Sequence, residues 1–510
     1  MLNVIQEVQG RISGGKVWGT KEWPMQGGET ERELAKAWLS AVTRTPSGEV
    51  GFWIVGGTAA VWMGDHWAFK GEKDLPGLVL VTMDRVWLEK NKVGRPRAGE
   101  EPEKVAVPWS GSMHQVEQVA KALWWMGRLE RGRDEFPLWV GKGERDVRTW
   151  VRYLDAVVDY RTLKVVEGVT WEFVNPMTVK CKWVEGAKCP RWERFLKEAH
   201  GDDTGGADVV ETGLGMMHVG GRCAPRKGVV QVGKPRAGKG VASAVGKRLV
   251  GAGQMVGMTP VAFTRPHGLE GLDRVCGIVV REAGDAPGGT QKAMAENLKH
   301  IWGEDDAPIN PKGVKQFFAR LSVQVFMQAN SVPPIADAKG GVSAKLAMVP
   351  YKYSYLGRED VTLEDQLVAE LEGIAQRVAA AAHRLLVGQK WPESSGGKEA
   401  LVEFMVENNP MQAFITEMLE EASGEEKVRI ITLRSLWKRW CVWKGVKPKG
   451  IAERMVGKRV KEDAPWVVGV RKTDGGAYFL TGLRVKRGAV EAMDRWYVDS
   501  NSGGDSPDHG

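Results

Sequence analysis

The 510-residue sequence has few cysteines and no long apolar runs, and each shortage excludes a class of protein. Its five cysteines include no CxxC pair, which excludes a disulfide scaffold and argues against a structural zinc site. No stretch approaches the roughly 18 consecutive apolar residues of a membrane helix. The first residues lack the basic and apolar pattern of a secretory leader. We therefore expect a cytoplasmic protein that makes no membrane contact.

The composition that remains is that of a folded protein with a locally concentrated charge. Hydrophobic residues make up 43% and charged residues 27%, enough for several buried cores in about two to four domains. The formal charge of +8 is not spread evenly, because residues 425–487 hold 17 Lys+Arg against 6 Asp+Glu. This concentration favours a polyanionic partner, most simply nucleic acid, over a merely solubilising basic surface.

Residues 425–487, which we call the basic module, have the pattern of helix, turn, basic helix and hairpin. Apolar residues at three- and four-residue spacings predict a helix from Ile431 to Gly445, with its tryptophans in the core rather than exposed for base stacking. A basic helix follows over 451–462, and two apolar runs joined at 474–476 predict a hairpin. This order is typical of a winged helix whose basic helix lies against DNA. The cations expected to contact DNA are Arg454, Lys458, Arg459 and Lys461.

A glycine-rich segment near the middle of the chain carries the strongest chemical signal. Val229–Val232 predict a buried strand, GKPRAGKG follows at 233–240, and a helix is expected to continue to Val250. Strand, loop and helix in this order predict a phosphate-binding P-loop with Lys239 on the β- and γ-phosphates, rather than a simple turn before a helix. Gly240 stands where the usual loop has Ser or Thr for magnesium. The residues predicted to line the nucleotide are Gly233, Pro235, Arg236, Ala237, Gly238, Lys239, Gly240 and Val241.

Two later apolar runs supply the other parts that phosphoryl transfer needs. Residues 275–280 predict a strand followed by Glu282, an acid suited to magnesium and the attacking water. Residues 321–330 alternate as a strand and end at Asn330, a polar side chain able to sense the γ-phosphate. The ordered trio favours an ATPase over other uses of a P-loop, such as a kinase or transferase.

The order of motifs resembles the superfamily 3 helicase portion of phage and plasmid primase-helicases, which are related to poxvirus-type helicase-primases. The resemblance rests on CPRWERFLKEAHGDD, GKPRAGKG, the stretch from HGLEGLDRVCGIVV to VFMQANSVPPIAD, and SYLGREDVTLEDQLVAELEGIAQRVAAAAHRLL, over roughly residues 100–390. It implies that Glu282 takes the place of the usual Walker B Asp, and that Lys345 takes the place of an arginine finger. The catalytic set implied in this way is Lys239, Glu282, Asn330, Lys345 and Arg358, and the DNA-gripping loop would contain Lys312 and Lys315.

The resemblance implies an α/β fold with an AAA+-like P-loop ATPase core and a small N-terminal α+β and helical collar domain, beside the C-terminal winged helix that the basic module predicts. A strand is also expected at 78–83, and loops or linkers at 201–208 and 393–399. The expected division is an N-terminal α+β region at 1–100, a collar at 101–200, the ATPase at 201–392, the winged helix at 400–490 and a disordered tail at 491–510.

The function implied is an ATP-dependent replicative DNA helicase of a phage, satellite or plasmid in the host cytoplasm. Such motors use ATP and magnesium, assemble as rings, commonly homohexamers, and translocate on single-stranded DNA. The basic module would hold duplex DNA, and a separate primase or polymerase could join, because no cluster of primase carboxylates is visible at 1–100. The alternative is a DNA-binding initiator that uses nucleotide for assembly and hydrolyses it weakly or not at all, which the glycine at 240 and the lysine at 345 favour.

Overall fold

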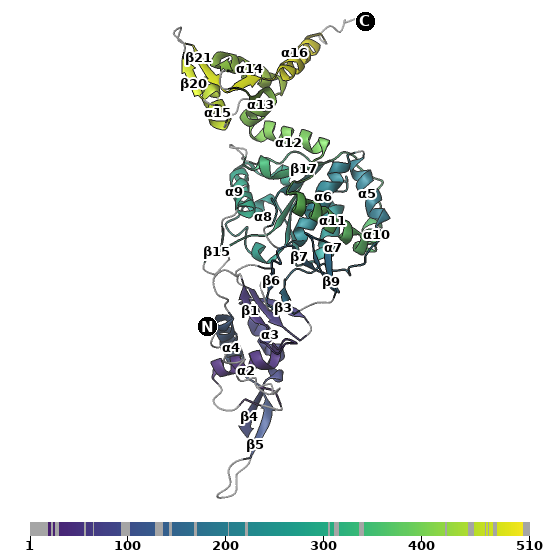
Figure 1. Ribbon diagram of the computed structural model, residues 1–510, viewed down its shortest axis with the longest axis vertical. Helices are drawn as coiled ribbons and strands as arrows, with labels where there is room; N and C mark the ends of the chain where they lie inside the picture. The colour runs from purple at the N-terminus through teal and green to yellow at the C-terminus, as the bar shows by residue number, and fades with distance from the viewer. Residues whose placement is uncertain are drawn as a thin grey trace.

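The chain is described by a computed structural model, and Figure 1 shows its parts in a row along the longest axis. N-terminal elements lie at one end, a parallel sheet with its helices in the middle, and C-terminal elements at the other end. The residues that the structure describes are 19–21, 24–25, 30–55, 58–64, 66–92, 103–127, 136–141, 145–167, 171–201, 203–219, 223–303, 306–310, 316–335, 341–423, 426–446, 453–464, 466–467, 469–472 and 477–502.

A five-stranded parallel sheet forms the centre of the molecule. Its strand order is β12-β13-β16-β11-β17, and each neighbouring pair is parallel. The chain is therefore a mixed α/β protein with a parallel sheet, which confirms the expected fold class at that level. The strands are β11 (Gly228–Gly233), β12 (Met255–Met258), β13 (Gly277–Val280), β16 (Gln324–Ala329) and β17 (Leu346–Tyr351).

Helices cover both faces of this sheet because its strands are apolar on both sides. Val229 packs into one hydrophobic core, and Val230 packs into the core on the opposite face. Polar side chains can therefore reach solvent where the strands end rather than along them. The first core contains α5 (Pro190–His200), α6 (Thr204–His218), α7 (Lys239–Val250), α10 (Leu363–Val368) and α11 (Leu371–Gly388), and the second contains α8 (Pro260–Phe263), α9 (Gln291–Trp302) and α12 (Ser395–Asn408).

Two of these helices begin where glycines favour loops in the sequence. α6 starts within the expected loop at 201–208, and α12 starts within the expected linker at 393–399. Their glycines serve close packing instead. A Cβ added to Gly205 would lie 2.6 Å from the Glu393 carbonyl oxygen, and one added to Gly397 would lie 2.3 Å from that of Met348. The prediction of loops at these places was therefore wrong.

In the described residues of the N-terminal part, an antiparallel sheet and a hairpin pack with the helices α2, α3 and α4. The run at 78–83, expected as a strand, is mostly helical because Leu75, Leu78, Val79 and Thr82 bury one face of a helix at three- and four-residue spacings. The Thr82 hydroxyl also accepts a hydrogen bond from the buried Trp38 indole at 2.9 Å. The elements are α2 (Glu31–Val42), β1 (Phe52–Val55), β2 (Thr58–Trp62), β3 (Trp67–Gly71), α3 (Leu75–Thr82), β4 (Trp87–Asn91), β5 (Lys104–Pro108) and α4 (Met113–Met126).

Tryptophans connect this N-terminal sheet to the short strands that precede the parallel sheet. Trp62 and Trp67 pack edge to face at 5.5 Å in a core shared with Leu138 and Val174, and the Trp67 indole donates to the carbonyl of Trp171 at 3.0 Å. Many of the 22 tryptophans are thus core residues. The domain division remains a prediction, except that the tail expected to be disordered from 491 is helical as far as Ser502, because Met493 packs into the C-terminal core. The short strands are β6 (Leu138–Trp139), β7 (Trp150–Arg152), β8 (Ala156–Asp159), β9 (Lys164–Glu167) and β10 (Phe173–Val174).

The C-terminal part packs helices against a small antiparallel sheet of order β19-β21-β20. Trp437 and Trp440 are buried and stacked, with ring centroids 5.5 Å apart, so these tryptophans are core as expected. The turn of the expected hairpin at 474–476 lies outside the described residues, but its two strands pair. The elements are α13 (Pro410–Met418), β18 (Leu419–Glu421), β19 (Lys427–Arg429), α14 (Ile430–Trp443), α15 (Val456–Asp463), β20 (Gly469–Lys472), β21 (Tyr478–Thr481), β22 (Leu483–Val485) and α16 (Arg487–Ser502).

Through the described part of the chain, no helix has both the length and the apolar character that a bilayer span requires. All five cysteines are free thiols.

Candidate nucleotide site and basic surface

The loop between β11 and α7 has a backbone that depends on its glycines. Gly238 caps α7 with a φ of 91°, and Arg236 has a φ of 58°. Both lie in the left-handed region, which glycine adopts freely and other residues adopt at a cost of about 1–2 kcal/mol. A Cβ on Gly233 would lie 2.2 Å from the carbonyl oxygen of Tyr351 in β17. The predicted strand, loop and helix are therefore present, with α7 ending at Val250 as expected.

The Lys239 side chain folds back over this loop. Its ammonium donates to the carbonyl oxygens of Gly233 at 2.5 Å and Lys234 at 2.7 Å, and to the Asn330 side-chain oxygen at 3.1 Å. Burial lowers the pKa of Lys239, because the charged form loses hydration that these acceptors replace in part. Anionic oxygens at the same place would hold the charge better than neutral carbonyls do. The arrangement is suited to a phosphate ligand.

Glu282 and Asn330 reach the same edge of the sheet as the loop. Met327 of β16 pairs with Val280 of β13 on one side and with Val230 of β11 on the other. Asn330 lies three residues beyond Met327, and Glu282 lies two beyond Val280. β16 separates β13 from β11, so the strand before Glu282 runs about 10 Å from the loop strand. Glu282 and the loop are therefore carried by the two strands that flank β16, the strand directly before Asn330.

Glu282 itself has an uncommon backbone. Its φ is 54°, it directly precedes the short 3-10 turn Ala283–Asp285, and its side chain is exposed. A non-glycine residue in the left-handed region costs about 1–2 kcal/mol, and such strained residues are enriched at functional sites. Among the described residues, no group of three or more His, Cys, Asp or Glu side chains gathers as a metal site. The role of Glu282 as a magnesium ligand stays a prediction.

The structure adds Gln328, which the sequence predictions missed. Its side-chain amide donates to the Lys239 carbonyl oxygen at 2.8 Å, to the Ser243 hydroxyl at 2.9 Å and to the Gln231 side-chain oxygen at 3.2 Å. Ser243 is buried and engaged in this way, so it does not replace the hydroxyl missing at Gly240. A polar residue near the end of a largely apolar strand was the available signal.

The segment after β17 lies against the loop. The Ser354 hydroxyl donates to the Pro235 carbonyl at 2.8 Å, and the Tyr355 backbone N–H donates to the Arg236 carbonyl at 3.0 Å. The Arg236 side chain in turn pairs with Glu359 at 3.6 Å. The Ser-Tyr-Leu-Gly-Arg-Glu-Asp motif thus borders the nucleotide loop of its own chain.

Arg358 of that motif is exposed and available. Its acidic neighbours are engaged elsewhere, Glu359 with Arg236 and Asp360 with Arg191 at 3.3 Å. Within the described part of the chain Arg358 makes no ion pair, so it is not simply paired with a local acid. Its role at the nucleotide stays a prediction.

Lys345 lies at the opposite edge of the sheet. It directly precedes β17, whose first residue Leu346 pairs with Gly228 at the start of β11. The six residues of β17 place it about 20 Å from the loop of its own chain. Burial lowers the pKa of nearby Lys227, Glu393 opposes this shift, and the positive charge of Lys345 adds to it. Any contact of Lys345 with nucleotide would therefore involve a neighbouring subunit.

The predicted DNA-gripping loop is framed by a hairpin. In the chain segment that connects β13 to β16, the strands β14 (Ala307–Ile309) and β15 (Phe317–Ala319) pair antiparallel as a separate hairpin. Lys312 and Lys315 lie outside the described residues, so the structure gives their flanking strands and not their side chains.

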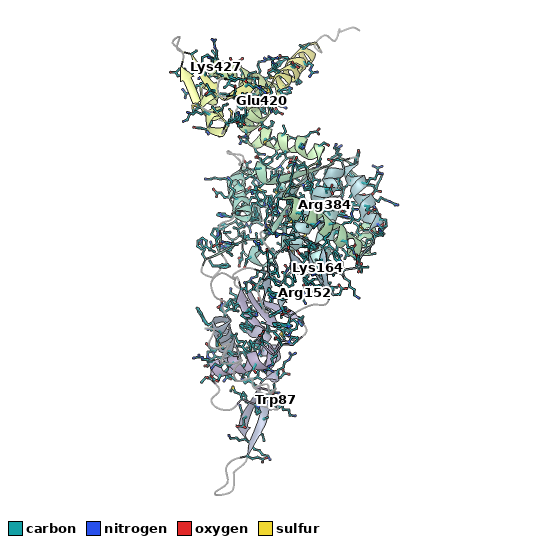
Figure 2. The ribbon with its side chains drawn as sticks, in the orientation of Figure 1. Trp87, Arg152, Lys164, Arg384, Glu420 and Lys427 are labelled. Carbon is teal, nitrogen blue, oxygen red and sulfur yellow. The ribbon has the colours of Figure 1, made fainter. Side chains whose placement is uncertain are left out.

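The predicted DNA-contacting cations are exposed on and just before α15. Arg454, Lys458, Arg459 and Lys461 all face solvent. The acid Glu462 is shared by Lys458 at 3.7 Å and Arg459 at 3.4 Å, so it offsets part of their charge. Figure 2 places a further cation, Lys427, at the end of the molecule opposite Trp87, and its ammonium lies 5.3 Å from the Phe479 ring centre.

Comparison with known proteins finds distant structural likenesses. No family model and no curated protein matches the chain. Three solved structures of the NrS-1 C-terminal region match with 10%, 11% and 10% sequence identity and TM-scores of 0.43, 0.42 and 0.39. The matches cover 85%, 90% and 84% of this chain and 96%, 100% and 96% of those chains.

Proposed function

We propose that the chain is a P-loop ATPase that drives a helicase-type motor on DNA. The observation that carries this proposal is the Lys239 ammonium, which contacts two loop carbonyls and Asn330 at the carboxyl edge of a parallel sheet. The strand order supports it, because the strand ending at Asn330 lies between the loop strand and the strand before Glu282. The resemblance of the sequence to superfamily 3 helicases supports the DNA motor in particular.

The residues have complementary roles in ATP hydrolysis on this proposal. The Lys239 ammonium would exchange its carbonyl acceptors for β- and γ-phosphate oxygens, and the N-terminus of α7 adds a favourable dipole. A water oxygen would form a bond to the γ-phosphorus, while the bond between the γ-phosphorus and the oxygen that bridges it to the β-phosphate breaks. Asn330 would orient that water, and the Glu282 carboxylate would accept the proton that it loses. Magnesium, when bound, would neutralise phosphate charge, with Glu282 and phosphate oxygens as its ligands.

The C-terminal part would hold duplex DNA as a winged helix. Helix α14, the basic helix α15 and the sheet β19-β21-β20 follow in the order that such a domain requires. The exposed cations of α15 would contact phosphates, and the β14–β15 hairpin would contact single-stranded DNA. Ring assembly, as a homohexamer, would bring Lys345 of one subunit to the nucleotide of the next.

The test is a DNA-stimulated ATPase assay on the purified chain. Lys239→Ala is expected to lower turnover at least about a hundredfold, because it removes the cation at the transferred phosphate. The matched control is Lys247→Ala, an exposed lysine two turns along α7, which should hydrolyse ATP like the wild type. Wild-type turnover no faster than that of Lys239→Ala would refute the motor.

One observation favours a second candidate, a DNA-binding initiator that binds nucleotide for assembly. Gly240 is exposed with open space around its Cα, and Ser243 is engaged by Gln328, so no hydroxyl is free for magnesium next to Lys239. This candidate predicts assembly with ATP and with a non-hydrolysable analogue alike, and no turnover above that of Lys239→Ala. Sedimentation with both nucleotides, measured beside hydrolysis, separates the two candidates.

A further inference from the structure

Gln328 and Asn330 lie two residues apart at the end of β16. Side chains two apart in a strand point to the same side, so both face the start of α7. Asn330 accepts a hydrogen bond from the Lys239 ammonium at 3.1 Å, and Gln328 donates to the Lys239 carbonyl oxygen at 2.8 Å. One strand therefore holds a single lysine at both its side chain and its main chain.

The Gln328 amide also fixes the next turn of the helix. It lies 2.9 Å from the Ser243 hydroxyl, four residues beyond Lys239. The amide thus bridges two groups of α7 one turn apart, which restrains both the position and the rotation of the helix start. Because Lys239 is the first residue of α7, the restraint acts where phosphates would be bound.

The contacts continue below the loop through a chain of buried polar groups. Gln328 lies 3.2 Å from the side-chain oxygen of Gln231, and Gln231 donates to the Tyr351 hydroxyl at 2.8 Å. Gln231 and Tyr351 are almost fully buried, and the Tyr351 carbonyl borders Gly233 at the loop start. β16, β11 and β17 are therefore connected by side chains directly beneath the loop.

This network lies beside a position that lacks the usual hydroxyl. A Ser or Thr after the P-loop lysine binds the metal and so connects the helix start to the metal–phosphate complex. Gly240 offers no such group. We propose that Gln328 is a positioning residue that sets the first turn of α7, and with it Lys239, for nucleotide phosphates. The inference rests on the proposed nucleotide site and adds a residue to it.

The same strand supplies a matched control. Gln324 lies four residues earlier on β16 and is buried, and its amide donates to the Lys227 carbonyl at 2.7 Å. It satisfies a backbone oxygen at the opposite edge of the sheet, far from the loop. A substitution at Gln324 therefore measures what losing a buried glutamine costs the fold alone.

The experiment compares Gln328→Met, Gln328→Glu and Gln324→Met in the full chain. Methionine keeps the size and removes the donor, and a glutamate carboxylate presents an acceptor to the Lys239 carbonyl. The readouts are the Kd for a fluorescent ATP analogue with magnesium, KM and kcat for hydrolysis, and hydrogen exchange over residues 233–245 without nucleotide. Lys239→Ala serves as the reference for a lost nucleotide site.

Both Gln328 variants are expected to raise Kd and KM about tenfold, because losing the bridge between the Lys239 carbonyl and the Ser243 hydroxyl loosens the helix start and weakens phosphate binding. Hydrogen exchange in the first turn of α7 should become faster. Gln324→Met should change Kd less than about twofold and leave that exchange unchanged. Should Gln328→Met fail to fold, Gln328→Glu gives the same comparison, and failure of both while Gln324→Met folds would make Gln328 a general core residue.

Two results would overturn the inference and identify which proposal fails. If the wild type binds the analogue, Lys239→Ala does not, and the Gln328 variants bind within twofold of the wild type, the positioning role is refuted and the nucleotide site stands. If Gln324→Met weakens binding of the analogue as much as the Gln328 variants do, the positioning role of Gln328 is also refuted. If the wild type binds no nucleotide, both proposals fall together.

Discussion

Lys239 at the sheet edge and the cations of α15 are both positive, and they differ in how their neighbours hold them. The Lys239 ammonium has three acceptors at 2.5–3.1 Å and is half-buried. Lys458 and Arg459 are exposed and share a single carboxylate at 3.4–3.7 Å. A fixed and poorly hydrated charge interacts strongly with a ligand charge at one point. Exposed charges interact with a charged ligand together and more weakly, because water and salt screen them. Single substitutions should therefore act steeply at the first region and gradually at the second.

The steepest effect is expected at Glu282. Glu282→Gln should lower ATP turnover by about 10²–10³-fold, because the amide cannot accept the proton of the attacking water. Nucleotide affinity should change much less. Steady-state hydrolysis and analogue binding measure the two effects separately. The control is Asp285→Asn, which changes an exposed acid three residues further along the chain. Equal losses of ATP turnover in both variants would contradict a specific role for Glu282.

The next largest effect is expected at the start of the loop. Gly233→Ala places a Cβ 2.2 Å from the Tyr351 carbonyl, which should lower the free energy of unfolding by about 2–3 kcal/mol and weaken nucleotide binding. Gly240→Ala has open space and should raise that free energy by up to about 1 kcal/mol. Urea denaturation of both variants tests this. Equal stabilities would contradict the close approach of β17 to the loop.

A moderate effect is expected for Lys345, and it depends on assembly of several subunits. Lys345→Ala should lower turnover about tenfold if the lysine acts on the nucleotide of a neighbouring subunit. Mixing it with Lys239→Ala should then restore part of the activity, since some interfaces combine an intact Lys239 with an intact Lys345. A mixture no more active than its components would rule out an action between subunits.

The smallest effects are expected on α15. Each neutralisation of Arg454, Lys458 or Arg459 should weaken duplex binding a few-fold and lower the slope of log affinity against log salt by about 1. Fluorescence anisotropy over a salt series measures this slope. Arg384→Gln and Lys398→Gln are matched controls, because each is an exposed cation with one acidic partner. A slope unchanged by the α15 variants would make those residues ordinary surface charge.

Much of the central fold could be predicted because its signals are local. The apolar run at 229–232, the glycines at 233 and 238 and the helix to Val250 describe one strand, loop and helix in sequence order. The run at 78–83 misled because its β-branched residues favour a strand, while packing of α3 decided for a helix. Glycines at 205 and 397 misled in the same way, since their contacts come from distant segments.

The residue types of the candidate site could be predicted from the sequence, but the residue that positions Lys239 could not. Lys239, Glu282 and Asn330 follow from motif order, and the structure brings them to one edge. Gln328 depends on the register of β16 against β11, which local sequence does not specify. The position of Lys345 also depends on strand register, which places it at the edge of the sheet away from the loop of its own chain, and its role as a finger stays a prediction.

Helix α12 gives the arrangement a mechanical consequence. Its Asn408 accepts from the backbone N–H of Ile335 at 2.9 Å and donates to the Pro333 carbonyl at 3.1 Å, in the segment that follows Asn330. The next residue, Asn409, caps α13 through the backbone N–H of Gln412 at 3.3 Å. The same helix buries Phe404 against the sheet. Two consecutive residues, Asn408 and Asn409, thus join the segment after Asn330 directly to α13, the first helix of the C-terminal part.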